Sequence, residues 1–506
     1  MSDSYSIAQL LGTLGEHALS VEVINPNTGK VSYHLPQFSY EEVLVTTVEA
    51  RKRTAAWAAV PVAERAAVAL KLHDLMTVHQ EKLLDLIQFE TGKTRAGAFE
   101  DFAGGLFAAR HYGKRAPKLL RLTPTRTDAP MFVRNYVDYP PVGVVGVITP
   151  WNFPMALPCF DVIPALLAGN IVVHKVDNQT ALTGLYLRQL ALEAGLPDGV
   201  WNLVVGSGPD AGNGVTDSVD YVAFTGSTNT GRIVAERAAH RLIGYSLELG
   251  GKNPAIVLPG ANLRKSARIV IAGAIGNAGQ ICVSIERCYV PAQVREEFIG
   301  ILEQELAAIR VGKSDKYDRD LGSLTSANQL KRVTGFLQAA RDKGVRVIGG
   351  ETAPDAGPYY VTPALVIEPT DDVELNRSEV FGPVIQVYGY ASVDEAVRAA
   401  NDSEFGLNAS VLGRPSEAIK IARRIQAGSV NINDGYRASF GSMSSPMGGV
   451  KHSGQGRRNG DGGILRFTEP KAIGVASGPL SLPTRADQYG AISKLLILLS
   501  KVLRRL

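Results

Sequence analysis

Residues 142–174 read VGVVGVITPWNFPMALPCFDVIPALLAGNIVVH, and this stretch decides the predicted fold. An apolar run, Val142–Ile148, precedes a helical pattern over Met155–Leu167 and a second apolar run, Ile171–His174. Short apolar runs that alternate with helices are typical of a parallel sheet that is covered on both faces. Ligands bind at the carboxyl edge of such a sheet, so the residues that follow these strands are candidates for a site.

The same alternation extends along the rest of the chain. A second α/β block starts near the Gly250–Gly251 pair, which gives two α/β domains of similar size with their boundary at that pair. Further strands are predicted at 131–139, 201–205, 221–224, 255–258, 287–290, 365–367 and 385–390. Further helices are predicted at 40–59, 62–89, 96–115, 181–194, 231–240, 263–278, 296–309, 393–401 and 416–425.

The composition is that of an ordinary globular protein. The 506 residues are 45% hydrophobic and 20% charged, which predicts two or three domains and excludes a disordered, collagen-like or coiled-coil protein. A net charge of +4 gives no electrostatic footprint for nucleic acid. Three cysteines form neither a disulfide framework nor a metal cluster, and residues 1–10 lack a secretory pattern. We therefore expect a cytoplasmic protein without a metal site.

Cys282 is the candidate nucleophile, in the segment Gly279-Gln280-Ile281-Cys282. A cysteine nucleophile needs backbone freedom around it and donors for the charge that develops on the substrate oxygen. A lone cysteine after a glycine is usually structural, and Cys159 and Cys288 lie within apolar patterns that favour that role.

Glu248 is the candidate acid or base. It begins Glu248-Leu249-Gly250-Gly251-Lys252, directly at the predicted domain boundary, where a carboxylate is placed to face a cleft. The double glycine lets the backbone turn sharply between domains. A solvated loop charge is the alternative interpretation.

Three further segments follow predicted strands. Asn152, in Pro150-Trp151-Asn152-Phe153-Pro154, is a neutral donor that suits an oxyanion site, although Asn and Pro also favour turns. Segment 224–231, Phe-Thr-Gly-Ser-Thr-Asn-Thr-Gly, opens a helix whose N–H groups can approach a pyrophosphate, although Ser and Thr caps are common there. Lys175 can reach a ribose hydroxyl or a phosphate, or lie on the surface.

Together these segments resemble the aldehyde dehydrogenase superfamily. They occur in that family's order over nearly the whole chain, from Asn25-Pro26 to Thr468-Glu469, and the separation of 34 positions from Glu248 to Cys282 matches the family's spacing. The signature segments are Pro150-Trp151-Asn152-Phe153-Pro154, Phe224-Thr225-Gly226-Ser227, Glu248-Leu249-Gly250-Gly251-Lys252, Gly279-Gln280-Ile281-Cys282 and Glu379-Val380-Phe381-Gly382-Pro383.

The resemblance implies a role for each candidate. Cys282 attacks the aldehyde as a thiolate and passes through a thiohemiacetal and a thioester, while the Asn152 amide and the Cys282 N–H hold the oxyanion. Glu248 activates the water that hydrolyses the thioester. The residues implied in cofactor binding are Trp151, Asn152, Lys175, Asp177, Asn178, Gly226, Ser227, Leu249, Glu379 and Phe381.

The resemblance also implies an architecture and an assembly. A Rossmann-type cofactor-binding domain would comprise residues 1–118 and 142–250, and an α/β catalytic domain residues 251–462. A small β oligomerisation arm, residues 119–141 and 463–477, would pair with another subunit in a homodimer or homotetramer. Residues 478–506 form a tail outside this plan.

Within the superfamily the chain is most similar to a branch of succinate-semialdehyde dehydrogenases, for which NADP is the usual cofactor. NAD-preferring members place a Glu three residues after the lysine, and here that position is Asn178, which removes a charge that would repel a 2′-phosphate. Asp177 adds a negative charge to the same turn and favours NAD unless it points outward. We expect NADP, with NAD as the alternative.

The resemblance makes succinate semialdehyde the expected substrate, and a more apolar aldehyde the alternative. The two arginines that hold the carboxylate of succinate semialdehyde in that branch correspond to Phe160 and Gly276 here, so either Arg437 replaces them or the aldehyde is a more apolar aliphatic or aromatic one. A coenzyme-A-acylating enzyme is a further alternative, against which Glu248 argues. A non-catalytic protein with this fold is disfavoured by the retained site residues. Ser284 replaces the second cysteine of redox-regulated members.

The C-terminus departs from the α/β pattern. Over 492–506, apolar residues share one helical face and Lys494, Lys501, Arg504 and Arg505 lie on the other. Such a helix either docks on its own protein or a neighbouring subunit, or makes peripheral contact with a membrane surface.

Overall fold

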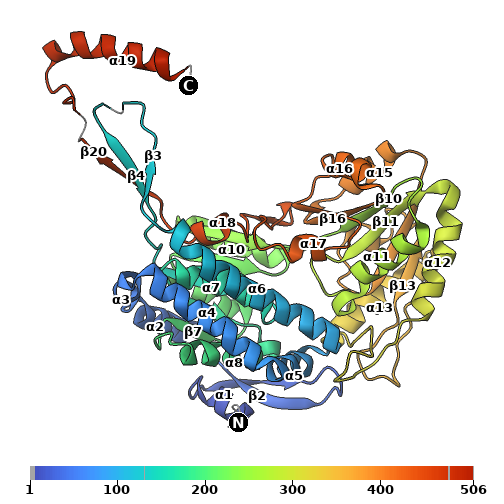
Figure 1. Ribbon diagram of the computed structural model, residues 1–506. Helices are drawn as coiled ribbons and strands as arrows, with labels where there is room; N and C mark the ends of the chain where they lie inside the picture. The colour runs from blue at the N-terminus through green and yellow to red at the C-terminus, as the bar shows by residue number, and fades with distance from the viewer. Residues whose placement is uncertain (1–5, 130, 477–478, 505–506) are drawn as a thin grey trace.

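Two mainly parallel sheets with helices packed on their faces make up the body of the protein (Figure 1). The structure is a computed structural model that describes residues 6–129, 131–476 and 479–504. The central strands of each sheet, such as β5 and β10, are short, fully buried and apolar, as a parallel sheet covered on both faces requires. The predicted α/β fold class is therefore confirmed.

The first sheet has six strands and carries most of the predicted cofactor-binding segments. Its strand order is β19 (Gly454–Gln455), β9 (Gly244–Glu248), β8 (Tyr221–Thr225), β5 (Val144–Ile148), β6 (Ile171–Lys175) and β7 (Trp201–Val204). The helices of this part are α1 (Ile7–Gly12), α2 (Tyr40–Arg51), α3 (Thr54–Ala59), α4 (Val62–Val78), α5 (Gln80–Thr91), α6 (Arg95–Leu119), α7 (Ala156–Leu167), α8 (Ala181–Glu193), α9 (Asn213–Ser218), α10 (Thr228–His240) and α18 (Gly462–Leu465).

The second sheet has seven strands and its own apolar core. Its strand order is β12 (Arg346–Gly349), β13 (Ala364–Ile367), β14 (Val384–Tyr390), β11 (Ile285–Pro291), β10 (Asn253–Val257), β16 (Asn408–Leu412) and β17 (Ser429–Ile432). Its helices are α11 (Leu263–Ile275), α12 (Arg295–Ala307), α13 (Ala327–Asp342), α14 (Glu374–Arg377), α15 (Val393–Asn401), α16 (Pro415–Ala422) and α17 (Arg437–Phe440).

Three smaller units complete the molecule. A three-stranded arm of β20 (Lys471–Val475), β4 (Arg134–Asp138) and β3 (Thr123–Thr125) stands away from the body and leads to α19 (Tyr489–Leu503) (Figure 1). The other two are antiparallel pairs, formed by β1 (Leu19–Ile24) with β2 (Val31–Gln37) and by β15 (Phe405–Gly406) with β18 (Val450–Lys451).

The Gly250–Gly251 pair lies between β9 of the first sheet and β10, the first strand of the second, where the sequence predicts the domain boundary. The chain crosses back later, because Gly454 of β19 pairs with Glu248. The boundaries 1–118, 142–250 and 251–462 stay predictions.

Several helix predictions are wrong in their limits. The helices expected over 40–59 and 62–89 are each two helices, broken near Lys52 and His79. The helix expected to end at residue 278 ends at Ile275, because Asn277 and Ala278 take positive φ angles of 47° and 54°. Helix α10 starts three residues earlier than expected because Ser227 caps it, accepting from the Thr230 N–H.

Candidate active site

A cavity of about 250 Å³ lies where the carboxyl ends of β5, β8 and β9 face the segments that precede β10, β11 and β14 of the second sheet. Nine of the twelve predicted site residues line it, which brings segments from five parts of the sequence together. The lining residues are Pro150, Trp151, Asn152, Leu157, Thr225, Gly226, Ser227, Glu248, Leu249, Gly250, Cys282, Gln329, Arg332, Glu379 and Phe381.

The Gly250–Gly251 pair lets the backbone pass between the candidate nucleophile and a carboxylate. A Cβ atom on Gly250 would lie 2.5 Å from Glu379 Oε2, and one on Gly251 would lie 2.6 Å from the Cys282 carbonyl oxygen. Neither position tolerates a side chain without displacing a neighbour. The pair is therefore needed for close approach of three segments, in addition to the turn that the sequence predicts.

Cys282 follows a tight turn whose Gly279 packs closely against the backbone of Gly382. Gly279 has φ +74°, and a Cβ atom there would lie 2.0 Å from the Gly382 carbonyl oxygen. Asn253 Nδ2 donates to the Cys282 carbonyl at 2.8 Å. Burial, then the charges of Glu379 and Glu248, raise the pKa of the Cys282 thiol to about 12. The free thiol is therefore protonated at neutral pH and needs a proton acceptor to react.

Glu248 ends strand β9 and is held by its backbone on both sides. Its carbonyl accepts from the Gly226 N–H at 3.1 Å, and it pairs with Gly454 in the sheet. The side chain is buried, and Glu248 Oε1 has no hydrogen-bond partner among the described residues. Burial raises the pKa of Glu248 to about 7, opposed by the charges of Arg458 and Arg466. A buried carboxylate oxygen without a partner, with a pKa near neutrality, suits a general base.

A buried ion-pair cluster that sequence reasoning missed lies close to Glu248. Asp161 of α7 accepts from Arg458 Nε at 2.9 Å and also contacts Arg466, and Arg458 contacts the Thr225 hydroxyl. Burial opposes ionisation of Asp161, but the two arginines outweigh it and hold its pKa below the usual value. The signal in the sequence is a lone Asp inside the apolar pattern of 155–167, which demands a buried partner.

Replacing Asp161 by Asn is expected to destabilise the fold by about 3–5 kcal/mol, because it leaves Arg458 and Arg466 buried without the carboxylate that pairs with them. Chemical denaturation monitored by circular dichroism measures the loss. The matched control is Asp371→Asn, which breaks the exposed pair with Arg377 and should cost less than about 1 kcal/mol. Equal losses for both variants would contradict the burial argument.

Asn152 projects from the turn before α7 with an amide that is only partly used. Its Nδ2 donates to the Gln280 carbonyl at 2.9 Å, which leaves one of its two hydrogens, and its Oδ1 has no partner among the described residues. Buried Asp101 fixes this turn by accepting from the Ala156 N–H at 2.7 Å. Lys93 pairs with Asp101 at 3.2 Å, a second buried ion pair that sequence reasoning missed.

Glu379 and Phe381 form the opposite wall. Glu379 Oε1 accepts from the Gly251 N–H at 2.9 Å, and burial followed by the charge of Glu286 raises its pKa to about 8. The carboxylate of Glu286 accepts from the N–H groups of Val380 and Phe381 and pairs with Lys252 Nζ at 2.5 Å. Sequence reasoning assigned Glu286 no role, although a charged residue within an apolar strand demands such partners.

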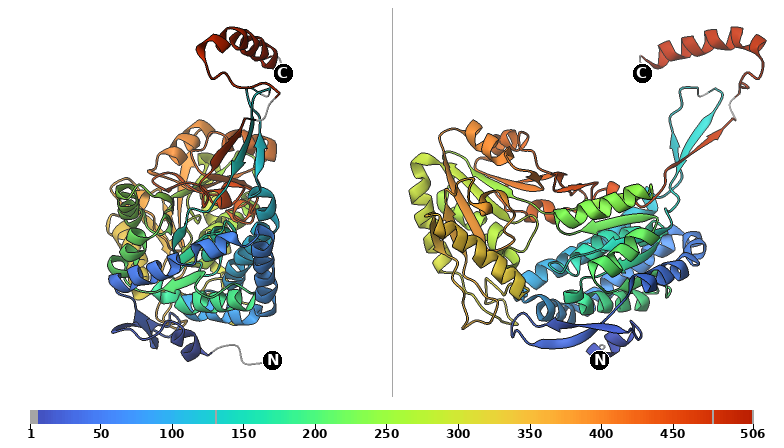
Figure 2. Two further views of the ribbon diagram at one scale, coloured as in Figure 1. Left: turned by 90° about the vertical axis from the view of Figure 1, so that its left-hand side faces the viewer. Right: turned by 180° about the vertical axis from the view of Figure 1, so that it is seen from behind.

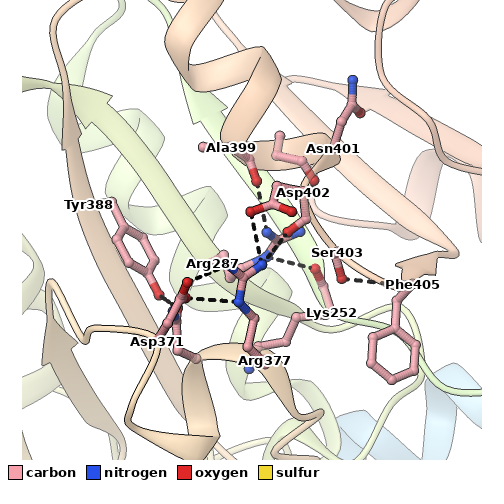
Figure 3. A network of polar contacts seen from close by, with 12 residues as sticks. Lys252, Arg287, Asp371, Arg377, Tyr388, Ala399, Asn401, Asp402, Ser403 and Phe405 are labelled. Carbon is pink, nitrogen blue, oxygen red and sulfur yellow. Dashed lines mark hydrogen bonds and ion pairs between the residues drawn. The ribbon is translucent and has the colours of Figure 1, made fainter.

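Arg377, two residues before Glu379, forms ion pairs with residues next to helices α14 and α15. Figure 3 shows Arg377 between Asp371, at 2.7 Å, and Asp402, at 2.9 Å. Arg377 and Asp402 also line a wider hollow of about 750 Å³. The two hollows share the lining residues Ser227, Arg332 and Glu379, so the cavity opens toward this groove.

Aromatic and small residues complete the cavity. The rings of Trp151 and Phe381 meet edge to face with centroids 5.7 Å apart, one from each sheet's loops. Gly226 and Ser227 lie at the N-terminus of α10, where backbone N–H groups favour an anion. Leu249 is buried beside them.

Lys175, Asp177 and Asn178 do not line the cavity. Asn178 donates to Gln37 Oε1 at 2.9 Å and accepts from the Gly206 N–H at 3.0 Å, which occupies both ends of its amide. Asp177 accepts from the N–H two residues on at 3.0 Å. Lys175 ends β6 at the same sheet edge, and its ammonium has no hydrogen-bond or ion-pair partner within 6–129, 131–476 and 479–504.

The expected carboxylate-binding position is not cationic. Phe160 is buried against Phe440, with ring centroids 5.5 Å apart, and a Cβ atom on Gly276 would lie 2.6 Å from the Tyr436 hydroxyl. Arg437, the predicted replacement, does not line the Cys282 cavity; its Nε donates to Glu100 Oε1 at 2.8 Å. The structure therefore does not support Arg437 as a free carboxylate-binding group.

Comparison with known proteins identifies the family. Residues 14–473 match the aldehyde dehydrogenase family. A protein of Mycolicibacterium smegmatis with the provisional name succinate-semialdehyde dehydrogenase, NADP(+), is 44% identical over 89% of this chain and 87% of its own. The crystal structure of an NAD-dependent aldehyde dehydrogenase from Sinorhizobium meliloti superposes with a TM-score of 0.88 at 32% identity, over 93% and 94% of the two chains. An NADP-dependent enzyme of E. coli gives 0.86 at 31% identity, over 91% and 95%. The chain belongs to the aldehyde dehydrogenase family.

Proposed function

We propose that this enzyme oxidises an aldehyde to a carboxylate with Cys282 as nucleophile and NADP as the preferred cofactor. One observation supports this most strongly: Cys282, Glu248 and Asn152 line a single cavity, and Glu248 Oε1 and Asn152 Oδ1 are buried there without partners among the described residues. Buried polar atoms that the protein leaves unpaired are poised for a ligand or water.

The chain's own groups supply the acid–base steps. When Cys282 Sγ bonds to the carbonyl carbon, the thiol proton must pass to a base. Glu248 accepts it, because its Oε1 has no partner among the described residues and its pKa is about 7. The remaining Asn152 N–H supports the negative charge on the former carbonyl oxygen. Glu248 releases this first proton to solvent and then takes a proton from the water that cleaves the thioester, which releases the acid and returns Cys282.

The residues around the cavity fit a nicotinamide dinucleotide. The N-terminus of α10 favours a pyrophosphate, and Glu379 offers a second carboxylate oxygen beyond the one bound to Gly251. The bound cofactor supplies the hydride acceptor for the oxidation. Lys175, without a protein partner among the described residues, and uncharged Asn178 favour a 2′-phosphate and hence NADP. Steady-state assays with NADP and with NAD test this, and a higher kcat/KM with NAD would contradict it.

The site favours an uncharged apolar or aromatic aldehyde. Phe160, at one of the two expected arginine positions, lies in an aromatic cluster with Phe153, Tyr436 and Phe440, none of which lines the Cys282 cavity itself. A carboxylate placed there without a cationic partner would cost several kcal/mol. The name of the M. smegmatis relative favours succinate semialdehyde as the second candidate.

A matched pair of substrates, butanal and succinate semialdehyde, is expected to separate these candidates. The two share a four-carbon chain, so the carboxylate is the difference, and we expect kcat/KM for butanal to be higher by about tenfold or more. Glu100→Gln is expected to narrow the gap, because it removes the carboxylate that neutralises Arg437. A lower KM for succinate semialdehyde than for butanal in the unmodified enzyme would reverse the choice.

Hydrolysis distinguishes this function from a coenzyme-A-acylating one. Water is the acceptor that a free Glu248 carboxylate can activate. We expect multiple turnovers of NADPH formation from the aldehyde without added coenzyme A. An absolute requirement for coenzyme A would contradict this assignment.

We also propose a homo-oligomer in a reducing compartment such as the cytoplasm. The arm of β3, β4 and β20 leaves two open strand edges away from the body, and such edges are pairing surfaces. The three cysteines are all unpaired, which supports a reducing compartment. Sedimentation velocity tests the assembly; a monomer at micromolar concentration would contradict it.

A further inference from the structure

Helix α19 stands apart from the rest of the molecule. In both views of Figure 2 it lies beyond the end of the arm, away from the body. It also lies beyond residue 473, where the match to the aldehyde dehydrogenase family ends. The helix is therefore an addition to the enzyme fold, remote from the Cys282 cavity.

The surface of α19 is strongly apolar on one side. Residues 492, 495, 496, 499 and 502 recur at the spacing of one helical face. Of the 22 large hydrophobic residues that are exposed in the described chain, seven lie between residues 479 and 503: Leu496 and Val502 on this face, Ile497 and Leu498 on the other side, and Leu480, Leu482 and Tyr489 before or at the start of the helix. Such a concentration of exposed apolar residues marks an interaction surface.

The opposite side of the helix carries Lys494 and Lys501 beside exposed Ile497 and Leu498, and the tail carries the whole net charge of the protein. Residues 478–506 contain five Lys and Arg and one Asp, so the remaining 477 residues contain 48 basic and 48 acidic residues. A second copy of this neutral body offers no acidic excess to attract the tail. An anionic lipid surface offers both the charge and the apolar layer that the helix matches.

We propose that α19 binds the surface of an anionic lipid bilayer and lies flat in its headgroup region. Its 15 residues extend about 22 Å, which is too short for the roughly 30 Å hydrocarbon core. In the described residues no helix combines the length and apolarity that crossing a bilayer requires. Apolar residues face the acyl chains, and Lys494 and Lys501 face the phosphate groups.

Vesicle flotation of the full chain tests this. Vesicles of phosphatidylcholine with and without 30% phosphatidylglycerol are compared, and the anionic vesicles are expected to carry at least about tenfold more protein. Deletion of residues 484–506 should abolish flotation and leave aldehyde oxidation unchanged. The Lys494→Glu/Lys501→Glu variant should also fail to float.

A matched pair of single variants tests the orientation of the helix. Leu499→Gln lies within the apolar face, whereas Ile497→Gln makes a similar change between the lysines, so the first should reduce flotation more than the second. Equal binding to neutral vesicles, or no loss on deletion, would overturn the proposal. A smaller oligomer after deletion, seen by sedimentation velocity, would also overturn it in favour of a second copy as the partner.

Discussion

Replacing Cys282 by Ala is expected to lower kcat/KM for aldehyde oxidation by about 10⁴-fold or more, because no other thiol lines the cavity in the described part of the chain. The variant should fold normally, since Cys282 is half-buried and the change removes one sulfur atom. Steady-state assays give the rate, and circular dichroism checks the fold. Oxidation at the normal rate would refute the mechanism.

Cys288→Ala provides the control. Cys288 is buried in β11, within the apolar core of the second sheet, and does not line the cavity. The variant should keep its activity within a small factor and lose some stability. Alkylation by iodoacetamide should label Cys282 in preference to Cys288, and the rate should rise with pH because the raised pKa of Cys282 keeps the thiol protonated near neutrality.

The fold and the site could be predicted to different depths. Short apolar runs and helical spacing were enough to predict two parallel sheets. The order of the motifs was enough to predict that Cys282, Glu248, Asn152 and Glu379 share a site, and all four line one cavity. Helix limits failed where the backbone adopts positive φ, as at Ala278, because nothing in that residue's type signals the strain.

The partners of buried charges could not be predicted. Asp161 reaches Arg458 and Arg466 across about 300 residues of sequence, and Glu286 holds the 380–381 backbone across about 95. Sequence shows that such charges need partners but not which ones, because the choice depends on how the two sheets face each other. The same limit applies to Arg437, whose position beside Glu100 follows from packing between α6 and α17.

Replacing Glu248 by Gln is expected to lower the steady-state rate by about 10²–10⁴-fold, because the amide cannot accept a proton from the attacking water. Because Glu248 also takes the Cys282 proton, rapid mixing should show slower formation of the first equivalent of NADPH, without a burst. In the unmodified enzyme the rate should rise with pH through about 7, as Glu248 ionises, and the variant should lose that rise. A normal turnover rate would show that another group activates the water.

The same substitution should stabilise the protein at pH 8, and this separates a functional carboxylate from a structural one. Between pH 4.5 and 7 the unfolded chain releases the Glu248 proton while the folded chain retains it, so stability falls as pH rises through this window. Above pH 7 the buried charge lowers the free energy of unfolding by its full amount, about 3 kcal/mol for a pKa raised from 4.5 to about 7. Gln carries no charge, so Glu248→Gln should raise Tm at pH 8 and change it little near pH 4.5. A lower Tm at pH 8 would mean that the ionised carboxylate holds the fold together, whereas a higher one would mean that the protein bears a buried charge for its chemistry.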